Sequence, residues 1–232
     1  MQDVINSFDA RVQEIDLYFR MLETLEEPNL QLCYPDRAPR HRYKTLDPEW
    51  LKTLKATAFL LIYNVVESSI RDGIGAIYEK AVADGCTVEL LDQRIRNIWI
   101  NQQYRAIDGG GSSVSFRNKC HDLVRIVLDR SIVELKKELV PMSGNLDARK
   151  IRELCDKHGL SFSNQRVAHM GDRLVTVKDK RNSLAHGEES FSECGRQHTV
   201  AELIEIKKQA IRFLRSVLRN IDRYIQAERY KA

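Results

Sequence analysis

The sequence predicts an all-α protein built as a helical bundle, and three observations lead to that prediction. No segment shows the sustained alternation of apolar and polar residues that is typical of strands, whereas apolar residues recur every three to four positions over most of the 232 residues. Only 11 residues are glycine and 5 are proline, which is few for a turn-rich β fold. Hydrophobic residues make up 43% and charged residues 30%, an ordinary balance for a soluble protein with a substantial core.

Residues 1–45 are predicted to be an addition to a main helical domain that spans 46–232. Apolar residues spaced by threes and fours over 3–27 predict an amphipathic helix with an acidic outer face. Residues 28–48 contain four of the five prolines and a group of basic side chains, namely Arg37, Arg40, His41, Arg42 and Lys44. We expect this segment to be an irregular basic connection.

The next helix is predicted to be the buried centre of the bundle. Asp47 is the expected N-cap and Pro48 the first helical residue, and the helix should run to about Ala83. Its middle is apolar on nearly all sides. The polar residues that interrupt it are Asn64, Glu67 and Arg71. Glu67 and Arg71 lie one turn apart and can form an ion pair.

Five further helices are predicted, each bounded by a cap or a helix-breaking residue. Their expected spans are about 15 residues from Thr87, then 114–140, a short helix within 143–161, then 163–186, and a last helix that begins at Thr199. Pro141 should stop the second of these. The short helix has Asp147 near its start and Gly159 past its end, and Thr199 with Glu202 has the pattern of a capping box.

Several classes of protein are disfavoured by the composition. The five cysteines are scattered without a CxxC pair, which is typical of reduced thiols in a cytosolic protein. A zinc site would require Cys155-x2-His158 to meet Cys194-x3-His198, and nothing else in the pattern supports it. We therefore expect no metal and no cofactor. The acidic, polar N-terminus does not resemble a signal peptide, and the most apolar run, 56–66, is too short to span a bilayer. A soluble, cytoplasmic protein without a membrane partner is expected.

The net charge of +4 is too small to identify a nucleic-acid partner, but its placement is informative. Residues 199–232 contain eight lysines and arginines against four acidic residues, so the last helix accounts for the whole excess. A basic stripe at helical spacing runs along it, formed by Lys208, Arg212, Arg215, Arg219 and Arg223. This stripe is either a solvated helix face or a track for the RNA backbone, which would give a salt-dependent affinity.

The segment KDKRNSLAHGEESFSECGR, 178–196, raises the main functional question. Arg181 and His186 are five residues apart, which on an α-helix is about 140° of net rotation and about 7.5 Å of rise. They cannot share one face of a continuous helix. The helix can unwind at His186, because Gly187 is a natural helix terminator. Alternatively, a two-fold dimer can bring the Arg181 of one copy near the His186 of the other.

The longer segment KDKRNSLAHGEESFSECGRQHTVAEL resembles the signature of the HEPN superfamily. The hallmark of that superfamily is Arg-x4–6-His, often with asparagine directly after the arginine, as at Asn182 here. The resemblance is closer to a stand-alone prokaryotic branch of HEPN-like nucleases first described from cyanobacteria. Blocks 59–81, 143–154 and 190–203 resemble its other conserved segments in the same order, so the resemblance covers about Leu46 to the C-terminus.

The resemblance implies a helical bundle that dimerises and brings two motifs into one cleft. It implies a metal-independent endoribonuclease, with His186 as acid and base, Arg181 binding the scissile phosphate and Asn182 as a supporting hydrogen-bonding residue. Glu67 and Asn64 are second candidates, since polar residues of the long helix can face the motif helix. The expected partners are RNA, a second copy and an antitoxin or other defence-system protein, because many relatives are toxins or phage-defence effectors. A non-catalytic HEPN module that binds RNA or a partner protein is the alternative.

Overall fold

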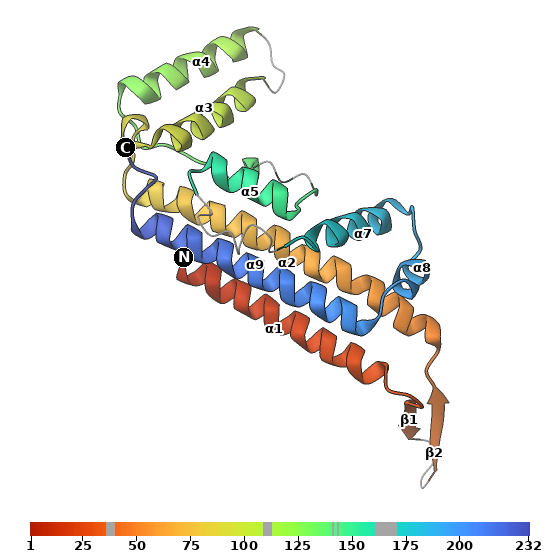
Figure 1. The fold of residues 1–232 in the computed structure, drawn as a ribbon. Helices are drawn as coiled ribbons and strands as arrows, with labels where there is room; N and C mark the ends of the chain where they lie inside the picture. Colours follow the sequence, from red (N-terminus) through yellow and green to blue (C-terminus); the bar gives the residue numbers. More distant parts are fainter. Residues whose placement is uncertain (36–39, 109–112, 141, 143, 161–170) are drawn as a thin grey trace.

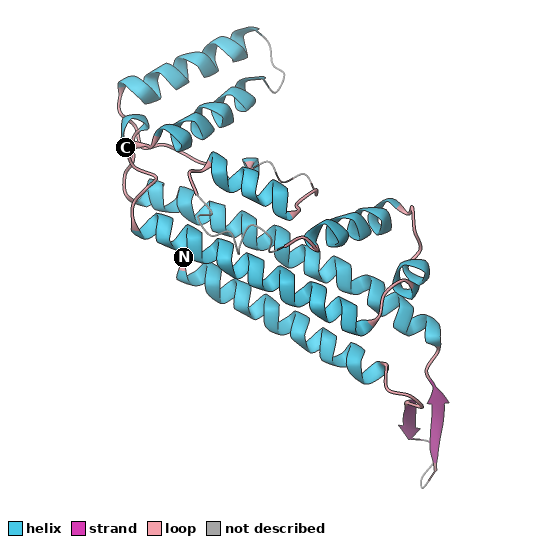
Figure 2. Ribbon diagram, in the orientation of Figure 1, coloured by secondary structure: helices cyan, strands magenta, loops and turns pink. Residues whose placement is uncertain are grey.

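The computed structural model of the chain describes residues 1–35, 40–108, 113–140, 142, 144–160 and 171–232. Eight α-helices and one two-stranded antiparallel sheet are found in these residues (Figures 1 and 2). The predicted all-α bundle is confirmed. The helices are α1 (Gln2–Leu25), α2 (Pro48–Ala83), α3 (Gln93–Asp108), α4 (Ser113–Leu128), α5 (Ala148–Lys157), α7 (Leu174–His186), α8 (Phe191–Arg196) and α9 (Val200–Gln226).

Three long helices form the centre of the molecule. α1, α2 and α9 lie side by side, and each contacts the other two (Figure 1). α2 is buried on several sides, as its apolar middle predicted, and α1 adds Phe8, Ile15, Phe19 and Leu22 to the same core. The division at residue 45 stays a prediction, but the helix before it packs against α2 and α9 rather than standing apart.

The predicted caps are confirmed. The Asp47 carboxylate accepts a hydrogen bond from the backbone N–H of Glu49, and α2 begins at Pro48. Asp147 caps α5 in the same way, and Thr199 exchanges two hydrogen bonds with Glu202 at the start of α9. These caps depend on residues within three positions of each other, and for that reason the sequence alone identifies them.

The prediction of an irregular connection over 28–48 is wrong where strands form. β1 (Gln31–Pro35) pairs with β2 (His41–Thr45) in an antiparallel hairpin, in which Cys33 lies opposite Tyr43. No residue of either strand is buried. Alternation of apolar and polar residues arises when one face of a strand packs on a core, so a hairpin with both faces exposed lacks that pattern.

The helix predicted over 114–140 ends earlier, at Leu128. Residues 133–136 form neither helix nor strand, with Val133 and Leu135 buried and Glu134 between them exposed. The Gln102 side chain holds this stretch, because it accepts from the N–H of Lys136 and donates to the carbonyl of the same residue. A hydrogen-bonding partner 34 residues away replaces the helix that local sequence favours.

The remaining helices lie outside the central three, and α7 and α8 pack against α2. α3 and α4 pack against each other at the end of the bundle that holds both chain termini, whereas α7 and α8 lie toward the opposite end (Figure 1). Within the predicted helix 163–186, residues 161–170 lie outside the described residues, and α7 begins at Leu174. Among the helices described, none has the length and apolar character that crossing a membrane requires.

Candidate functional site

α7 carries the Arg-x4-His motif and remains wound through His186. Gly187 has φ +70°, the left-handed conformation that glycine adopts without strain. The N–H of Gly187 donates to the carbonyl of Leu184, and the N–H of Glu188 donates to that of Ser183 at 2.9 Å. These two bonds form a Schellman motif. The structure therefore does not unwind at His186, and the first of the two expected ways to bring the motif together is not the one adopted.

Contacts between α7 and the residues that flank α8 fix the turn that follows the motif. The ammonium group of Lys180 forms an ion pair with Glu189 at 3.0 Å and donates to Gln197 at 2.6 Å. Both lysine and glutamate side chains are largely buried, with exposed fractions of 20% and 15%. The turn after His186 is thus tied back to its own helix.

α8 is in turn pressed against the first turns of α2. A Cβ added at Gly195 would lie 1.8 Å from the carbonyl oxygen of Lys52, so only glycine allows this approach. The Lys55 side chain donates to the backbone carbonyl of His198, and the His198 ring packs edge-on against Phe59. The segment after the motif has a structural role, which is to hold α7 on the bundle.

The Arg181 side chain is half-buried and held on three sides. Its guanidinium carbon lies 4.7 Å from the centre of the Tyr63 ring of α2, a cation–π contact. Nη1 donates to the side-chain oxygen of Asn182 at 2.9 Å and to the carbonyl of Gly144 at 3.4 Å. A Cβ at Gly144 would lie 2.9 Å from Nη1, and φ there is +65°. The cation is therefore fixed in position before any ligand arrives.

The segment before α5 completes this cluster. Asn182 donates to the side-chain oxygen of Asn145 at 2.8 Å, and the N–H of Leu146 donates to the Tyr63 hydroxyl at 3.2 Å. Lys178 forms an ion pair with Asp147 at 3.4 Å. Burial raises the pKa of Tyr63, so its hydroxyl stays neutral. Sequence reasoning did not identify Tyr63, Gly144 or Asn145, because these contacts join residues 37 to 118 positions apart.

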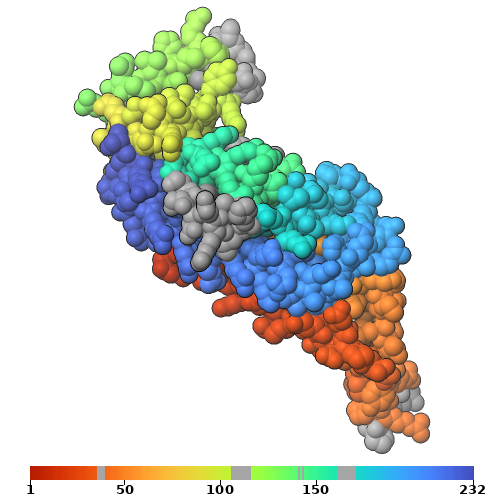
Figure 3. Space-filling view, viewed as in Figure 1, coloured from red at the N-terminus to blue at the C-terminus, as the bar shows by residue number. Residues whose placement is uncertain are grey.

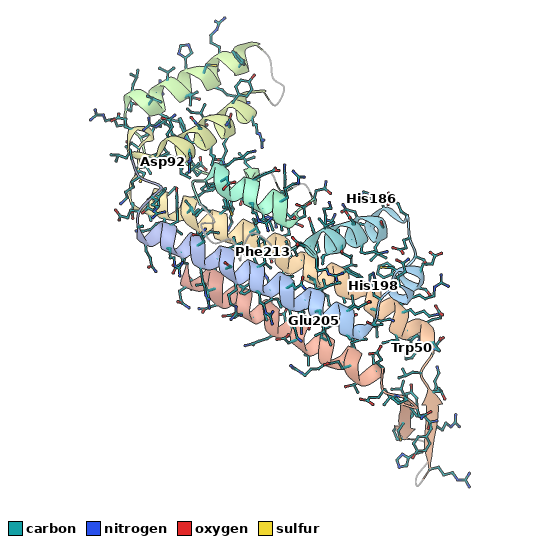
Figure 4. The ribbon with its side chains drawn as sticks, in the orientation of Figure 1. Trp50, Asp92, His186, His198, Glu205 and Phe213 are labelled. Carbon is teal, nitrogen blue, oxygen red and sulfur yellow. The ribbon has the colours of Figure 1, made fainter. Side chains whose placement is uncertain are left out.

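His186 differs from Arg181 in being exposed. Within the described part of the chain, its side chain makes no hydrogen bond and no ion pair. Figure 4 places it at the outer end of α7, away from the central helices. His186 is therefore accessible to solvent and does not lie in the hydrophobic interior. Since α7 is wound between the two residues, Arg181 and His186 of one chain face directions about 140° apart.

The second candidates have other surroundings. Glu67 forms the expected ion pair with Arg71, at 2.6 Å between Oε1 and Nη2. Asn64 is exposed. No hydrogen bond or ion pair among the described residues joins either Asn64 or Glu67 to α7.

The basic stripe of α9 is exposed, but acidic residues engage part of it. Arg215 forms an ion pair with Asp9 of α1 at 2.8 Å and lies over the Phe8 ring. Lys208 pairs with Glu205 at 2.8 Å. Arg212, Arg219 and Arg223 have no ion pair with any described residue. Some of the stripe therefore serves to dock α1.

Comparison with protein families gives one match. The model of the HEPN_MAE_28990-like HEPN family matches residues 1–230. The match includes α1 and the β1–β2 hairpin as well as the motif helix, so it reaches further toward the N-terminus than the resemblance of the sequence blocks did. Comparisons with curated proteins and with solved structures give no match.

Proposed function

We propose that this chain, which belongs to the HEPN_MAE_28990-like HEPN family, is a metal-independent endoribonuclease whose catalytic residues are Arg181, Asn182 and His186. Family membership supports a nuclease or RNA-related module. The observation that carries the finer proposal is the contrast within α7: Arg181 is held rigidly, while His186 is exposed and has no partner in the described residues. A fixed cation and an accessible imidazole, brought together from two copies of the chain, would suit phosphodiester chemistry.

Cleavage of RNA requires no metal when the substrate supplies its own nucleophile. A neutral imidazole takes the proton of the 2′-hydroxyl, whose oxygen then forms a bond to phosphorus. The bond from phosphorus to the 5′-oxygen breaks, and a protonated imidazole gives that oxygen its proton. Histidine as a residue type has an ordinary pKa near neutrality, which suits both tasks. The planar arginine side chain can bind two phosphate oxygens at once and stabilise their charge.

The wound helix favours a site shared between two copies of the chain. One chain does not direct Arg181 and His186 to a common point, whereas a two-fold axis beside α7 would bring two motifs into one groove. The two copies of His186 would then act as base and acid. Such a ribonuclease would serve as a toxin or phage-defence effector, restrained by an antitoxin or another partner protein.

One observation favours a second candidate, a non-catalytic module that binds RNA or a protein. The three contacts of Arg181, to Tyr63, Asn182 and Gly144, are all internal. An arginine used only to join α7 to α2 would have the same contacts. The two candidates differ in whether the guanidinium and the imidazole act on RNA.

The test is incubation of the purified protein with total RNA in EDTA, with the His186→Ala protein as the control. We expect the wild type alone to cut, leaving 2′,3′-cyclic phosphate and 5′-hydroxyl ends. RNA binding without cleavage by the wild type would support the second candidate. Equal cleavage by both proteins would contradict the assignment of His186.

A mixing experiment tests the shared site. Arg181→Ala and His186→Ala proteins are each expected to be inactive, and refolding them together should restore part of the activity, because mixed dimers contain one intact arginine and one intact histidine from different chains. Each variant refolded alone is the control. If the mixture stays as inactive as its components, the two residues do not act across the dimer.

A further inference from the structure

The β1–β2 hairpin does not pack on the hydrophobic core. It projects beyond the ends of α1 and α2, and the space-filling view narrows to this projection (Figures 1 and 3). No strand residue is buried, and only Leu32 is partly covered. A lone two-stranded hairpin is marginally stable in water. Its side chains therefore do not serve packing, and their chemistry requires another explanation.

The chemistry of the hairpin is basic and aromatic. We call its described residues, 31–35 and 40–45, the basic arm. Arg40, Arg42 and Lys44 lie in it, together with His41. Tyr34 and Tyr43 are 44% and 65% exposed, so both rings are accessible to a ligand. Cations and exposed rings together are the features with which proteins bind single-stranded nucleic acid.

The register places a ring on each face of the arm and the lysine and arginine side chains on one of them. Tyr34 lies opposite Arg42, so their side chains share one face. Tyr43 lies opposite Cys33, on the other face, which it shares with His41. At the base of the arm, the Lys44 ammonium lies 5.5 Å from the centre of the Trp50 ring. Trp50 is itself 46% exposed, and so adds a third ring to the same end of the molecule.

The basic stripe of α9 provides an internal comparison. There, Asp9 and Glu205 neutralise two of the cations. Arg212 and Arg219 have no ion pair with a described residue, and the same holds for Arg40 and Lys44 of the basic arm, so both surfaces offer positive charge to a polyanion. The arm differs in adding exposed rings, whereas the Phe213 and Tyr224 rings of α9 are buried. A peptide that adds a strand to the hairpin is a poorer fit, because Pro35 lacks an N–H and charged side chains follow the edge of β2.

The arm and His186 lie at the same end of the molecule. β2 leads directly into the first turn of α2, where Glu49 accepts a hydrogen bond from Ser192 of α8. α8 follows the turn that contains His186 and Gly187. In Figure 4, His186, His198 and Trp50 succeed one another toward the hairpin. A strand of RNA held by the arm would be close to the motif end of α7.

We propose that the basic arm binds single-stranded RNA, with its cations on the phosphates and its tyrosines stacked on the bases. This inference rests on the proposed function, since it assigns the arm to the substrate of the same enzyme. The occupant is RNA rather than an anionic protein because the exposed rings match bases as well as the cations match phosphates.

The test measures the binding of a labelled 20-nucleotide polyuridine to the full chain in EDTA, in a His186→Ala background that cannot cleave it. The arm variant is Arg40→Thr with Lys44→Thr, and the matched control is Arg212→Gln with Arg219→Gln, which removes the same charge from α9. We expect the arm variant to lower affinity at least about tenfold at low salt and to reduce the slope of log affinity against log salt by about 1.4. The control should change affinity less than about twofold.

Removing the rings separates stacking from charge. Tyr34→Thr with Tyr43→Thr should lower affinity about tenfold while leaving the salt slope unchanged. Equal losses in the arm and α9 variants would reduce the effect to net charge and overturn the proposal. Unchanged RNA binding by the arm variants would also overturn it, and would leave an anionic protein as the occupant.

The failure of this inference is distinguishable from the failure of the proposed function. If the wild type cleaves RNA and the arm variants bind and cleave it equally well, the proposed nuclease function stands and the role of the arm is contradicted. If RNA binding depends on the arm but no cleavage occurs, the role of the arm stands and the proposed nuclease function is contradicted. All four substituted arm residues are exposed, so the thermal unfolding of each variant should match that of the parent protein and exclude a folding defect.

Discussion

Two helices of this protein end in the same dipeptide, and the two ends have opposite surroundings. α5 is followed by His158 and Gly159, whereas α7 ends in His186 and is followed by Gly187. Both glycines have positive φ, +80° and +70°. As local structures the two helix ends are close to interchangeable.

The two histidines differ in burial and in hydrogen bonding to the rest of the protein. His158 is 2% exposed, its Nδ1 donates to the carbonyl of Leu154 at 2.7 Å, and its Nε2 accepts from the Tyr78 hydroxyl at 2.8 Å. Burial lowers the pKa of His158 to about 4. His186 is exposed and forms no bond to any described residue. The same local signal thus marks a structural histidine in one place and an accessible one in the other, and tertiary packing makes the difference.

The largest expected effect concerns activity. His186→Ala should lower the rate of RNA cleavage about 10²- to 10⁴-fold, because it removes the acid and base group. Its free energy of unfolding should change by less than about 0.5 kcal/mol, as for other exposed side chains. Single-turnover cleavage and denaturant unfolding on the same preparation check both. If the variant lost stability as well as cleavage rate, His186 would have a structural role, as His158 does.

The converse change should act on stability alone. His158→Ala leaves a cavity and removes the bonding partners of Tyr78 and Leu154, so we expect a loss of about 3 kcal/mol in the free energy of unfolding. Cleavage at a temperature where the variant remains folded should match the wild type. A large fall in rate without loss of stability would mean that His158, and not only His186, takes part in the reaction.

Local interactions were predictable from the sequence, and the caps show why. Asp47, Asp147 and Thr199 act on residues two or three positions away, and Gly159 needs only its own freedom at positive φ. The non-helical stretch at 133–136 was missed because Lys136 forms its hydrogen bonds with Gln102 on another helix. The hairpin was missed because neither of its faces packs on the core, so its sequence lacks the alternation of apolar and polar residues that identifies a strand.

The candidate site divides in the same way. The spacing of Arg181 and His186 and the asparagine between them were visible in the sequence, and the resemblance gave them roles. The contacts that hold the cation were not visible, because Tyr63 and Asn145 come from segments far along the chain. Nor could the sequence show which of two histidines before a glycine is exposed. That depends on whether a neighbouring helix covers the end, as α2 does for His158 through Tyr78.

The pH dependence of stability provides a smaller contrast. Because the pKa of His158 is about 4 in the folded chain and about 6.5 for an ordinary histidine, the unfolded state binds a proton between these values that the folded state does not. The free energy of unfolding should therefore have its highest value above pH 6.5, where His158 is neutral in both states. It should fall by up to about 3 kcal/mol as the pH drops toward 4. Chemical unfolding from pH 7 to 4 should show a shallower fall for His158→Gln than for the wild type.

His198, whose pKa burial also lowers, contributes equally to the wild type and to His158→Gln, so it does not alter the comparison between them. If His158→Gln kept the full slope of the wild type, the loss of stability at low pH would have to arise from groups other than His158.

The smallest effect compares the two glycines. An alanine pays about 1 kcal/mol for the left-handed conformation at either position, because its Cβ crowds the backbone there. At Gly187 the added Cβ meets nothing within 4 Å, so Gly187→Ala should lower the free energy of unfolding by that amount and no more. At Gly159 it would lie 3.1 Å from Nη1 and 3.4 Å from Cδ of Arg94, so this neighbour must move and Gly159→Ala should be the more destabilising change. Unfolding of the two variants gives the order, and Gly187→Asn should recover part of the loss, since asparagine tolerates positive φ. The reverse order would mean that the end of α7 is packed against something the isolated chain does not contain, and a second copy seated on His186 would produce that result.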